Sequence, residues 1–140
     1  MSLFRIVYVS DAVGDAREGL MPLIDIIGAS DRNNRRDHLT GVLMRHDGQF
    51  FQAVEGARVD LDRLMGRLRA DCRHTNIQVL ADSRIDHRLF ADWAMAQADA
   101  PPALERLLER RSDHGLYNAA FMGDAERILF DTSQALAAAC

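Results

Sequence analysis

The sequence predicts an α+β domain, in which a mixed sheet of five strands carries two helices on one face. Strand-like and helix-like patterns follow one another along residues 3–98 in the order strand, helix, strand, strand, helix, strand, strand. An Asp47-Gly48 pair between two apolar runs is typical of a tight hairpin. Helical crossovers make some neighbouring strands parallel, so we expect a mixed sheet.

The first strand is predicted over residues 3–10, and a loop follows at 11–15. The first helix begins near residues 20–22, because proline is tolerated in a first turn. Its apolar stripe consists of Leu20, Leu23, Ile24 and Ile27. We expect residues 30–34 to end this helix, since Ser, Asp and Asn favour caps and turns.

The remaining elements of the sheet follow the same reasoning from apolar periodicity. Strands are predicted at 39–44, in the run 48–56, at 77–81 and at 93–97, and a second helix at about 59–70. This order is the ferredoxin-like split βαβ arrangement with one extra strand.

Two short helices are predicted after the Pro101-Pro102 break, at 103–111 and at about 124–138. Neither is long enough to fold alone. We therefore expect them to pack on the free face of the sheet or against a second subunit. The domain boundary falls at residue 98, and residues 99–140 form a helical extension of the same compact unit.

Composition narrows the classes of function. The chain has 140 residues, enough for one domain, with a net charge of −4 and no lysine, so nucleic-acid binding and lysine chemistry are not expected. No apolar run approaches the roughly 20 residues that span a bilayer, and the start does not resemble a signal peptide. We expect a cytoplasmic protein without metal, in which Cys72 and Cys140 are free thiols.

Two polar side chains occur on otherwise apolar strand faces. Alternation places Tyr8 beside Phe4 and Ile6, and Gln52 between Phe50 and Val54. A buried, unpaired amide costs roughly 1–3 kcal/mol, so Gln52 must have partners. The two groups fit either a grip on a flat, polar-edged ligand or an internal network, and the residues alone favour the network.

Six segments in order resemble the BLUF family of blue-light sensors that use flavin, in its short single-domain type. They are residues 5–10, 30–34, 39–43, 50–56, 71–74 and 90–95. Leu39 stands where the family usually has isoleucine, a conservative departure. The resemblance covers about residues 3–98 and implies FAD as a noncovalent cofactor, with FMN or riboflavin as possible substitutes.

The resemblance also implies roles for individual residues. Tyr8 matches the tyrosine that donates an electron and then a proton to the photoexcited flavin, and Gln52 the glutamine that bridges it to the ring. Trp93 and Met95 match the pair that reports the change. The other implied contacts with the cofactor are Ser30, Asn33, Asn34, Arg67, Asp71, Arg73 and His74.

The expected function is therefore a photoreceptor, not an enzyme, that signals through the last strand and the C-terminal helices. Its expected partners are a separate signalling protein and a second copy of the chain. Two alternatives remain open: a flavin-binding adaptor without photoactivity, and a small ferredoxin-like enzyme that uses Arg73 and His74. Without the family, Arg67 and Asp71 would be read as a surface ion pair at helical spacing.

Overall fold

The computed structural model describes residues 2–114 and 119–139. The strands are β1 (Leu3–Ala12), β2 (Thr40–His46), β3 (Gln49–Gly56), β4 (His74–Ile85) and β5 (Ala96–Gln97). The helices are η1 (Gly14–Arg17), α1 (Leu20–Asp37), α2 (Arg58–Ala70), α3 (Pro102–His114) and α4 (Ala119–Ala139). Cys72 is an exposed free cysteine, and Cys140 lies outside the described residues.

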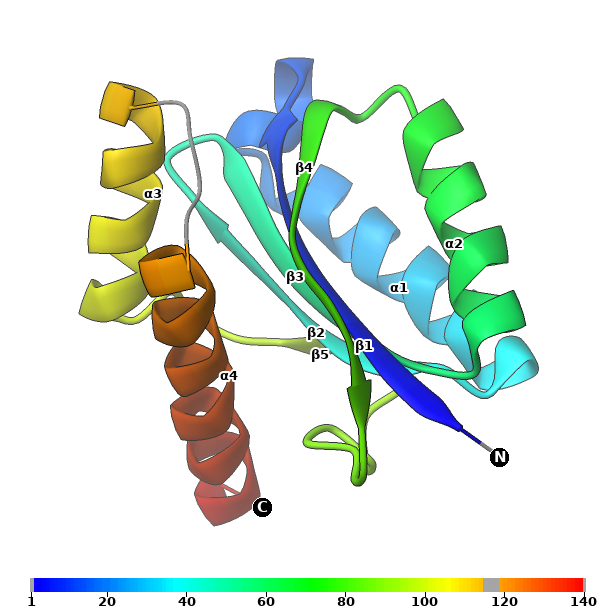
Figure 1. Cartoon of the computed structure of the whole chain (residues 1–140). Helices are drawn as coiled ribbons and strands as arrows, with labels where there is room; N and C mark the ends of the chain where they lie inside the picture. Colours follow the sequence, from blue (N-terminus) through cyan, green and yellow to red (C-terminus); the bar gives the residue numbers. More distant parts are fainter. Residues whose placement is uncertain (1, 115–118, 140) are drawn as a thin grey trace.

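The five strands form one sheet in the order β4-β1-β3-β2-β5. The pairs β1–β3, β1–β4 and β2–β3 are antiparallel, and β2–β5 is parallel, so the sheet is mixed. Helices α1 and α2 lie on one face of the sheet, and α3 and α4 lie on the other (Figure 1). The predicted ferredoxin-like α+β fold is thus confirmed, and the two C-terminal helices cover the second face.

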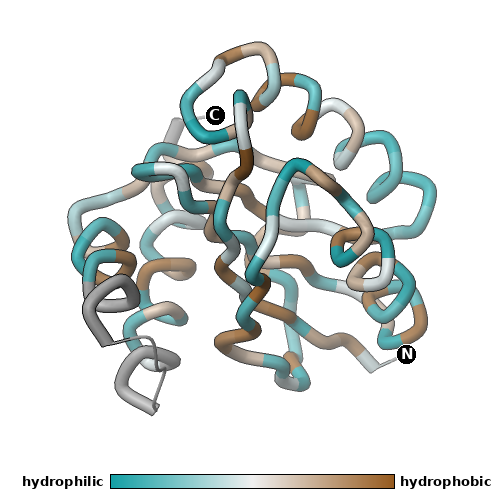
Figure 2. The backbone as a smooth tube through the Cα atoms, turned by 90° about the horizontal axis from the view of Figure 1, so that it is seen from above, coloured by the Kyte–Doolittle hydropathy of each residue, from teal (hydrophilic) through white to brown (hydrophobic). Residues whose placement is uncertain are grey.

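Each face of the sheet has its own apolar core. The cluster under α1 and α2 contains Ile6, Tyr8, Leu43, Phe50, Val54, Leu61, Leu64 and Met95. The cluster under α3 and α4 contains Val9, Met44, Phe51, Phe90, Leu104, Leu107, Ile128 and Leu129. Hydrophobic residues concentrate accordingly on the central strands, with hydrophilic residues on outer turns of the helices (Figure 2). Every residue of β3 is buried, because both of its faces are covered.

The hairpin between β2 and β3 turns at Asp47 and Gly48, as predicted. Their φ angles are 49° and 72°, and two consecutive positive φ values are typical of a two-residue hairpin whose twist matches that of the strands.

The predicted end of the first helix at residues 30–34 was wrong, since α1 continues to Asp37 and ends at His38 with φ 57°. The Asn34 side chain donates its hydrogen bond to the Ala94 carbonyl and does not compete for its own backbone. The amide of His38 bonds to the carbonyl of Asn34, as in a left-handed helix cap.

Two strands also differ in length from the prediction. Strand β4 extends well beyond residues 77–81, because β1 offers pairing partners from Leu3 to Ala12. Strand β5 is limited to Ala96 and Gln97, and residues 93–95 belong to the preceding loop. Helix α3 runs further than predicted and α4 begins earlier.

In the described parts of the chain, no helix has the length and apolar character of a membrane span.

Candidate cofactor-binding site

Tyr8 and Gln52 lie directly opposite each other on the paired strands β1 and β3. The Tyr8 hydroxyl donates a hydrogen bond to Oε1 of Gln52. Both side chains are buried, at 1% and 4% exposure. Burial, assisted by the negative charge of Asp71, raises the pKa of Tyr8 well above its ordinary value. The phenol is therefore neutral throughout the physiological range.

The amide nitrogen of Gln52 has a much weaker partner. Its Nε2 lies 3.8 Å from Sδ of Met95, and a thioether sulfur is a poor acceptor. A ligand with a ring nitrogen or a carbonyl oxygen at this place would satisfy the amide better. Tyr8 and Gln52 thus form the internal hydrogen bond that the strand patterns suggest, and Gln52 Nε2 remains available as a donor to a ligand.

Asn34, near the end of α1, carries a second unfilled requirement. Its Nδ2 donates to the Ala94 carbonyl over 2.7 Å, and the residue is fully buried. Its Oδ1 is buried without a hydrogen-bond partner. Because nearly all buried polar atoms in proteins are paired, this oxygen indicates a place for an N–H group of a ligand.

A pocket lies over the sheet between α1 and α2. The predicted residues that line it are Ser30, Asn33, Gln52, Arg67, Asp71, Arg73 and His74. Its apolar walls come from Ile26, Leu43, Phe50, Leu64 and Leu68. Apolar walls with a few convergent polar groups are typical of a small-molecule site.

The pocket encloses about 90 Å³, less than the roughly 300 Å³ at the lower end of small-molecule sites. Helix α1 buries only Leu23, Asn34 and Asp37. Its predicted apolar stripe is accordingly only partly correct, since Leu20 and Ile24 are 68% and 50% exposed. Ile26 and Ile27 of the same helix are partly buried against the α1–α2 cluster.

The two arginines of the pocket are each held by a carboxylate. Arg67 Nη2 lies 3.1 Å from Asp37, and Arg73 Nη2 lies 2.6 Å from Asp71. The surface ion pair between Arg67 and Asp71, which their spacing would suggest without the family, is not formed, because the chain turns after Ala70 and brings Arg73 back onto Asp71. Hydrogen bonding from Arg73 lowers the pKa of Asp71.

His74 is fixed at both ring nitrogens. Its Nε2 lies 2.7 Å from the Leu68 carbonyl, and its Nδ1 lies 2.8 Å from Oγ of Ser10. A carbonyl only accepts, so Nε2 carries a proton, and in the neutral ring Nδ1 accepts from Ser10. The sequence prediction did not include Ser10. Its signal was a polar residue on the same strand face as Ile6 and Tyr8, and Ser10 is fully buried.

Trp93 and Met95 belong to opposite sides of the molecule. Met95 is buried in the α1–α2 cluster beside Gln52, whereas Trp93 packs against the α3–α4 cluster. Between them, the Ala94 carbonyl accepts from Asn34. The sequence left open which of the two lies nearer the site, and in this structure it is Met95.

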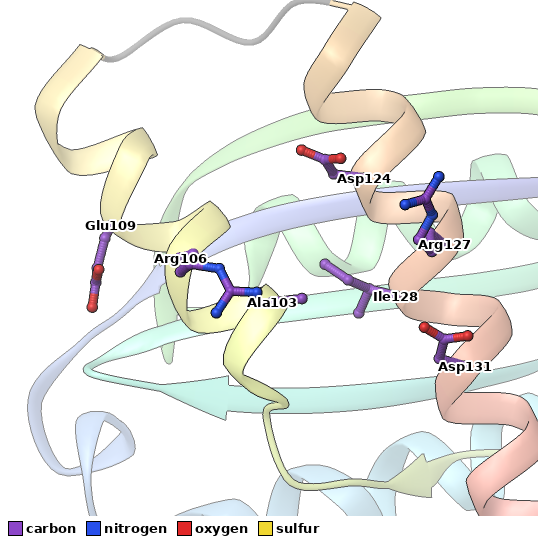
Figure 3. A pocket seen from close by; sticks show the side chains of 7 residues that line it. All are labelled: Ala103, Arg106, Glu109, Asp124, Arg127, Ile128 and Asp131. Atoms are coloured by element: carbon purple, nitrogen blue, oxygen red, sulfur yellow. The ribbon is translucent and has the colours of Figure 1, made fainter.

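A larger cleft of about 600 Å³ lies between α3 and α4, away from Tyr8 and Gln52 (Figure 3). Ile128 and Arg106 point into the gap between the helices, and Glu109 points away from it. Ala103, Asp124, Arg127 and Asp131 complete the lining. This cleft is lined by none of the predicted cofactor contacts, whereas seven of them line the smaller pocket over the other face.

Fold and site together define a small α+β domain with an apolar, polar-edged pocket between two helices on one face of its sheet. The family of sensors of blue light using FAD, BLUF, has a sequence model that matches residues 3–96. The chain belongs to the BLUF family. The matched domain is a sensor module and not an enzyme, and FAD is its cofactor.

Relatives and solved structures agree with this assignment. Photoactivated adenylate cyclase subunit beta of Euglena longa is 32% identical over 94 residues, which are 67% of this chain and 11% of that protein. A bacterial light-regulated adenylyl cyclase has a TM-score of 0.73 and 33% identity, over 81% of this chain and 35% of that one. The BLUF protein BlrB in its dark state has a TM-score of 0.74 and 25% identity, over 93% and 96% of the two chains.

The chain thus spans only a small part of the cyclase relatives and nearly all of BlrB. Its own residues fit a flavin, because Gln52 presents an amide donor in an apolar pocket and Asn34 presents a buried acceptor, Oδ1, without a partner. These are the complementary groups that a ring edge with alternating N–H and carbonyl groups requires. Asn34 does not itself line this pocket, but it lies on the same helix as the lining residues Ser30 and Asn33.

Proposed function

We propose that the chain is a blue-light photoreceptor in which Tyr8 and Gln52 form the switch. The observation that carries the proposal is the buried chain of contacts from the Tyr8 hydroxyl to Gln52 Oε1 and from Gln52 Nε2 to Met95. These contacts connect the neutral phenol of Tyr8 with the amide of Gln52, which carries both a donor and an acceptor, and with the thioether of Met95. Met95 belongs to the segment that connects the pocket with β5.

The pocket residues hold the cofactor. Asn33 and Asn34 would bind the polar edge of the ring, with Ser30 one turn away on the same helix. Arg67, Asp71, Arg73 and His74 would contact the ribityl chain and the exposed side. Since these groups grip the ring and the ribityl chain, FMN or riboflavin would also be accepted in place of FAD.

The bound flavin supplies the absorption of blue light and, once excited, the capacity to accept an electron and a proton. Tyr8 is the donor, since it is buried and neutral beside the site. Loss of an electron makes its phenolic proton strongly acidic, and that proton leaves along the hydrogen bond to Gln52. Gln52 relays it, because an amide carries both a donor and an acceptor.

The changed arrangement of the Gln52 amide then persists after the proton transfer. Rotation or tautomerisation of this amide exchanges the donor and the acceptor that it presents to the ring edge. A new hydrogen bond to a ring carbonyl stabilises the excited state more than the ground state, so we expect a small red shift in absorption. Rotation would move Nε2 away from Met95, and tautomerisation would remove a hydrogen from Nε2, so either change alters the contact between Gln52 and the 93–95 segment.

We infer that the signal leaves through this segment to α3 and α4 and then to a separate signalling protein, or changes a homodimer, in the cytoplasm. Trp93 supports this route because it packs against the α3–α4 cluster. The charged cleft between these helices supplies a surface on which a partner can dock (Figure 3). In the cyclase relatives, whose names state that they are photoactivated, the matched region is about a tenth of the protein.

Gln52→Leu tests the switch, with Met95→Leu as the matched control. Leucine keeps the approximate volume of Gln52 and removes the amide, so the flavin should bind but its absorption should not shift in blue light. Met95→Leu removes only the weak acceptor and should keep the shift. A shift that persists in Gln52→Leu would contradict a switch built on this amide. A wild-type chain that binds flavin and shows no shift in blue light would favour the flavin-binding adaptor. An enzyme using Arg73 and His74 is not favoured, since the family model that matches residues 3–96 is one of blue-light sensors.

A further inference from the structure

Glu55 is a fully buried carboxylate at the end of β3, three residues from Gln52 and on the opposite face of the strand. It accepts from Arg5 Nε and Nη2 at 3.0 and 2.8 Å and from Thr40 Oγ1 at 3.0 Å. It also accepts from the backbone N–H groups of Leu89 and Phe90, at 2.8 and 3.0 Å. A buried charge is tolerated only with such partners.

The two backbone donors belong to the irregular segment between β4 and β5, residues 86–95. The side chain of Arg88, in the same segment, donates to groups on and next to β2 and β3. Its Nη1 donates to Thr40 Oγ1 at 2.9 Å and to the Glu55 carbonyl at 3.0 Å, and its Nη2 donates to the His38 carbonyl at 2.9 Å. Residues 88–90 are therefore anchored to β2 and β3 from both sides.

The far end of the same segment meets the switch. The Trp93 carbonyl accepts from the Gly41 amide, the Ala94 carbonyl from Asn34, and Met95 Sδ lies by Gln52 Nε2. Only a few residues separate the anchor from these contacts, so the anchor limits where Met95 and Trp93 can lie. Asn34 and Gln52 are proposed cofactor contacts, whereas the groups bonded to Glu55 are not among them.

We propose that Glu55 is a positioning residue for the light response. Its carboxylate, together with Arg88, fixes residues 88–90, so that Met95 lies against Gln52 and Trp93 lies against the α3–α4 cluster. A change at Gln52 then moves the short stretch 93–95 relative to a fixed point. This inference rests on the proposed function, because it assigns the fixed end of the segment through which that signal leaves.

A general structural role for Glu55 predicts a different pattern of effects. A variant of Arg5 distinguishes the general structural role from the positioning role. Both side-chain hydrogen bonds of Arg5 go to Glu55, and neither goes to the 86–95 segment. Arg5→Met removes the ion pair and keeps an apolar stem, while Glu55 keeps Thr40 and both loop amides as donors. Glu55→Gln replaces one acceptor oxygen by an NH₂ group, which faces a donor from the loop or from Arg5. Arg88→Met removes the second anchor without touching the carboxylate.

The test uses two readouts on the flavin-loaded chain. The first is quenching of tryptophan fluorescence by acrylamide in the dark, which reports on Trp93 because it is the only tryptophan. The second is the rate of dark recovery after blue light. Loss of one net hydrogen bond corresponds to roughly a fivefold change in rate. We expect Glu55→Gln and Arg88→Met to be quenched more strongly and to recover roughly fivefold faster, and Arg5→Met to behave like the wild type in both readouts.

Wild-type quenching and recovery in Glu55→Gln would overturn the inference, as would an Arg5→Met variant that reproduces the full effect. If Glu55→Gln does not fold, Arg88→Met decides, because Arg88 is half-exposed and its loss leaves the carboxylate satisfied. A wild-type chain that binds flavin without any light-induced shift would instead contradict the proposed function. Increased dark quenching in the two anchor variants would then still support the anchoring of the segment.

Discussion

At Tyr8, a phenol without access to water faces an amide across two paired strands, and its protonation is controlled by this burial. The family resemblance predicted that Tyr8 and Gln52 act together, and the alternation of the strands predicted that each lies on an apolar face. Their direct pairing in register required the structure, because alternation alone does not determine which residues of two strands lie opposite each other.

The raised pKa of Tyr8 predicts a specific loss of stability in alkali. In the unfolded chain a tyrosine ionises near pH 10, whereas Tyr8 in the folded chain keeps its proton to higher pH. The unfolded state therefore binds fewer protons above about pH 10, and the free energy of unfolding falls as pH rises. Urea unfolding of the wild type and Tyr8→Phe at about pH 9 and about pH 11 measures this, and the decline should be smaller in the variant. Equal declines would contradict a buried neutral phenol.

Asp37 predicts a loss of stability in acid. Hydrogen bonding from Arg36, together with that from Arg67, lowers the pKa of Asp37 to about 2. Its contribution is present above about pH 4 and lost as pH falls toward 2. Because the Arg36 side chain is 62% exposed, we expect Asp37→Asn to cost less than about 1 kcal/mol at neutral pH. Denaturation midpoints from neutral to acidic pH should converge for wild type and variant, and a constant difference would contradict the assignment.

At the scale of elements, the order of strands and helices was predictable because each element buries a periodic apolar face. Helix ends were less predictable, since Asn34 bonds to the distant Ala94 carbonyl and leaves α1 free to continue. The length of β4 depends on the length of β1, and the shortness of β5 depends on contacts of residues 93–95 with other elements. None of these partners is visible in the local sequence.

The Glu55 network was also missed, although one signal was present. An acidic residue within a run of apolar residues on a strand with two covered faces must have partners. Its donors Leu89 and Phe90 are backbone groups, which no side-chain pattern can indicate. Similarly, the sides on which Trp93 and Met95 lie depend on the path of an irregular segment.

A pair of glycine substitutions tests the packing of two elements. In β2, a Cβ on Gly41 would meet the Ala53 carbonyl of β3, so Gly41→Ala should destabilise the fold by about 1–3 kcal/mol. In α2, Gly66 has open space around it, and Gly66→Ala should stabilise by about 0.5–1 kcal/mol. Urea denaturation of both variants measures the difference. A neutral Gly41→Ala would contradict the close approach of β2 and β3.

At the scale of the whole molecule, two helices on each face enclose a sheet whose central strand β3 carries Gln52 toward one core and Phe51 toward the other. The cofactor site and the α3–α4 surface are therefore separated by a single layer of strands (Figure 1). A displacement of a strand in this layer changes the packing on both faces of the sheet, because close-packed cores transmit small shifts.

Joint unfolding of the helical extension with the sheet is tested by Leu107→Ala. Leu107 of α3 is fully buried in the cluster under α3 and α4, so its truncation should cost about 2–5 kcal/mol. We propose that residues 99–140 unfold with the sheet, so the flavin signal and the circular dichroism signal should be lost together at a lower denaturant concentration. Two separate transitions, with the flavin site unaffected, would contradict this.

Absorption spectroscopy of the flavin-loaded protein before and after blue light, with Tyr8→Phe beside it, tests the central claim most directly. We expect a small, reversible shift to the red in the wild type and none in Tyr8→Phe, which keeps the ring and loses the hydroxyl that bonds to Gln52. An equal shift in both proteins, or a bound flavin whose spectrum never moves in the wild type, would contradict a switch built on Tyr8 and Gln52.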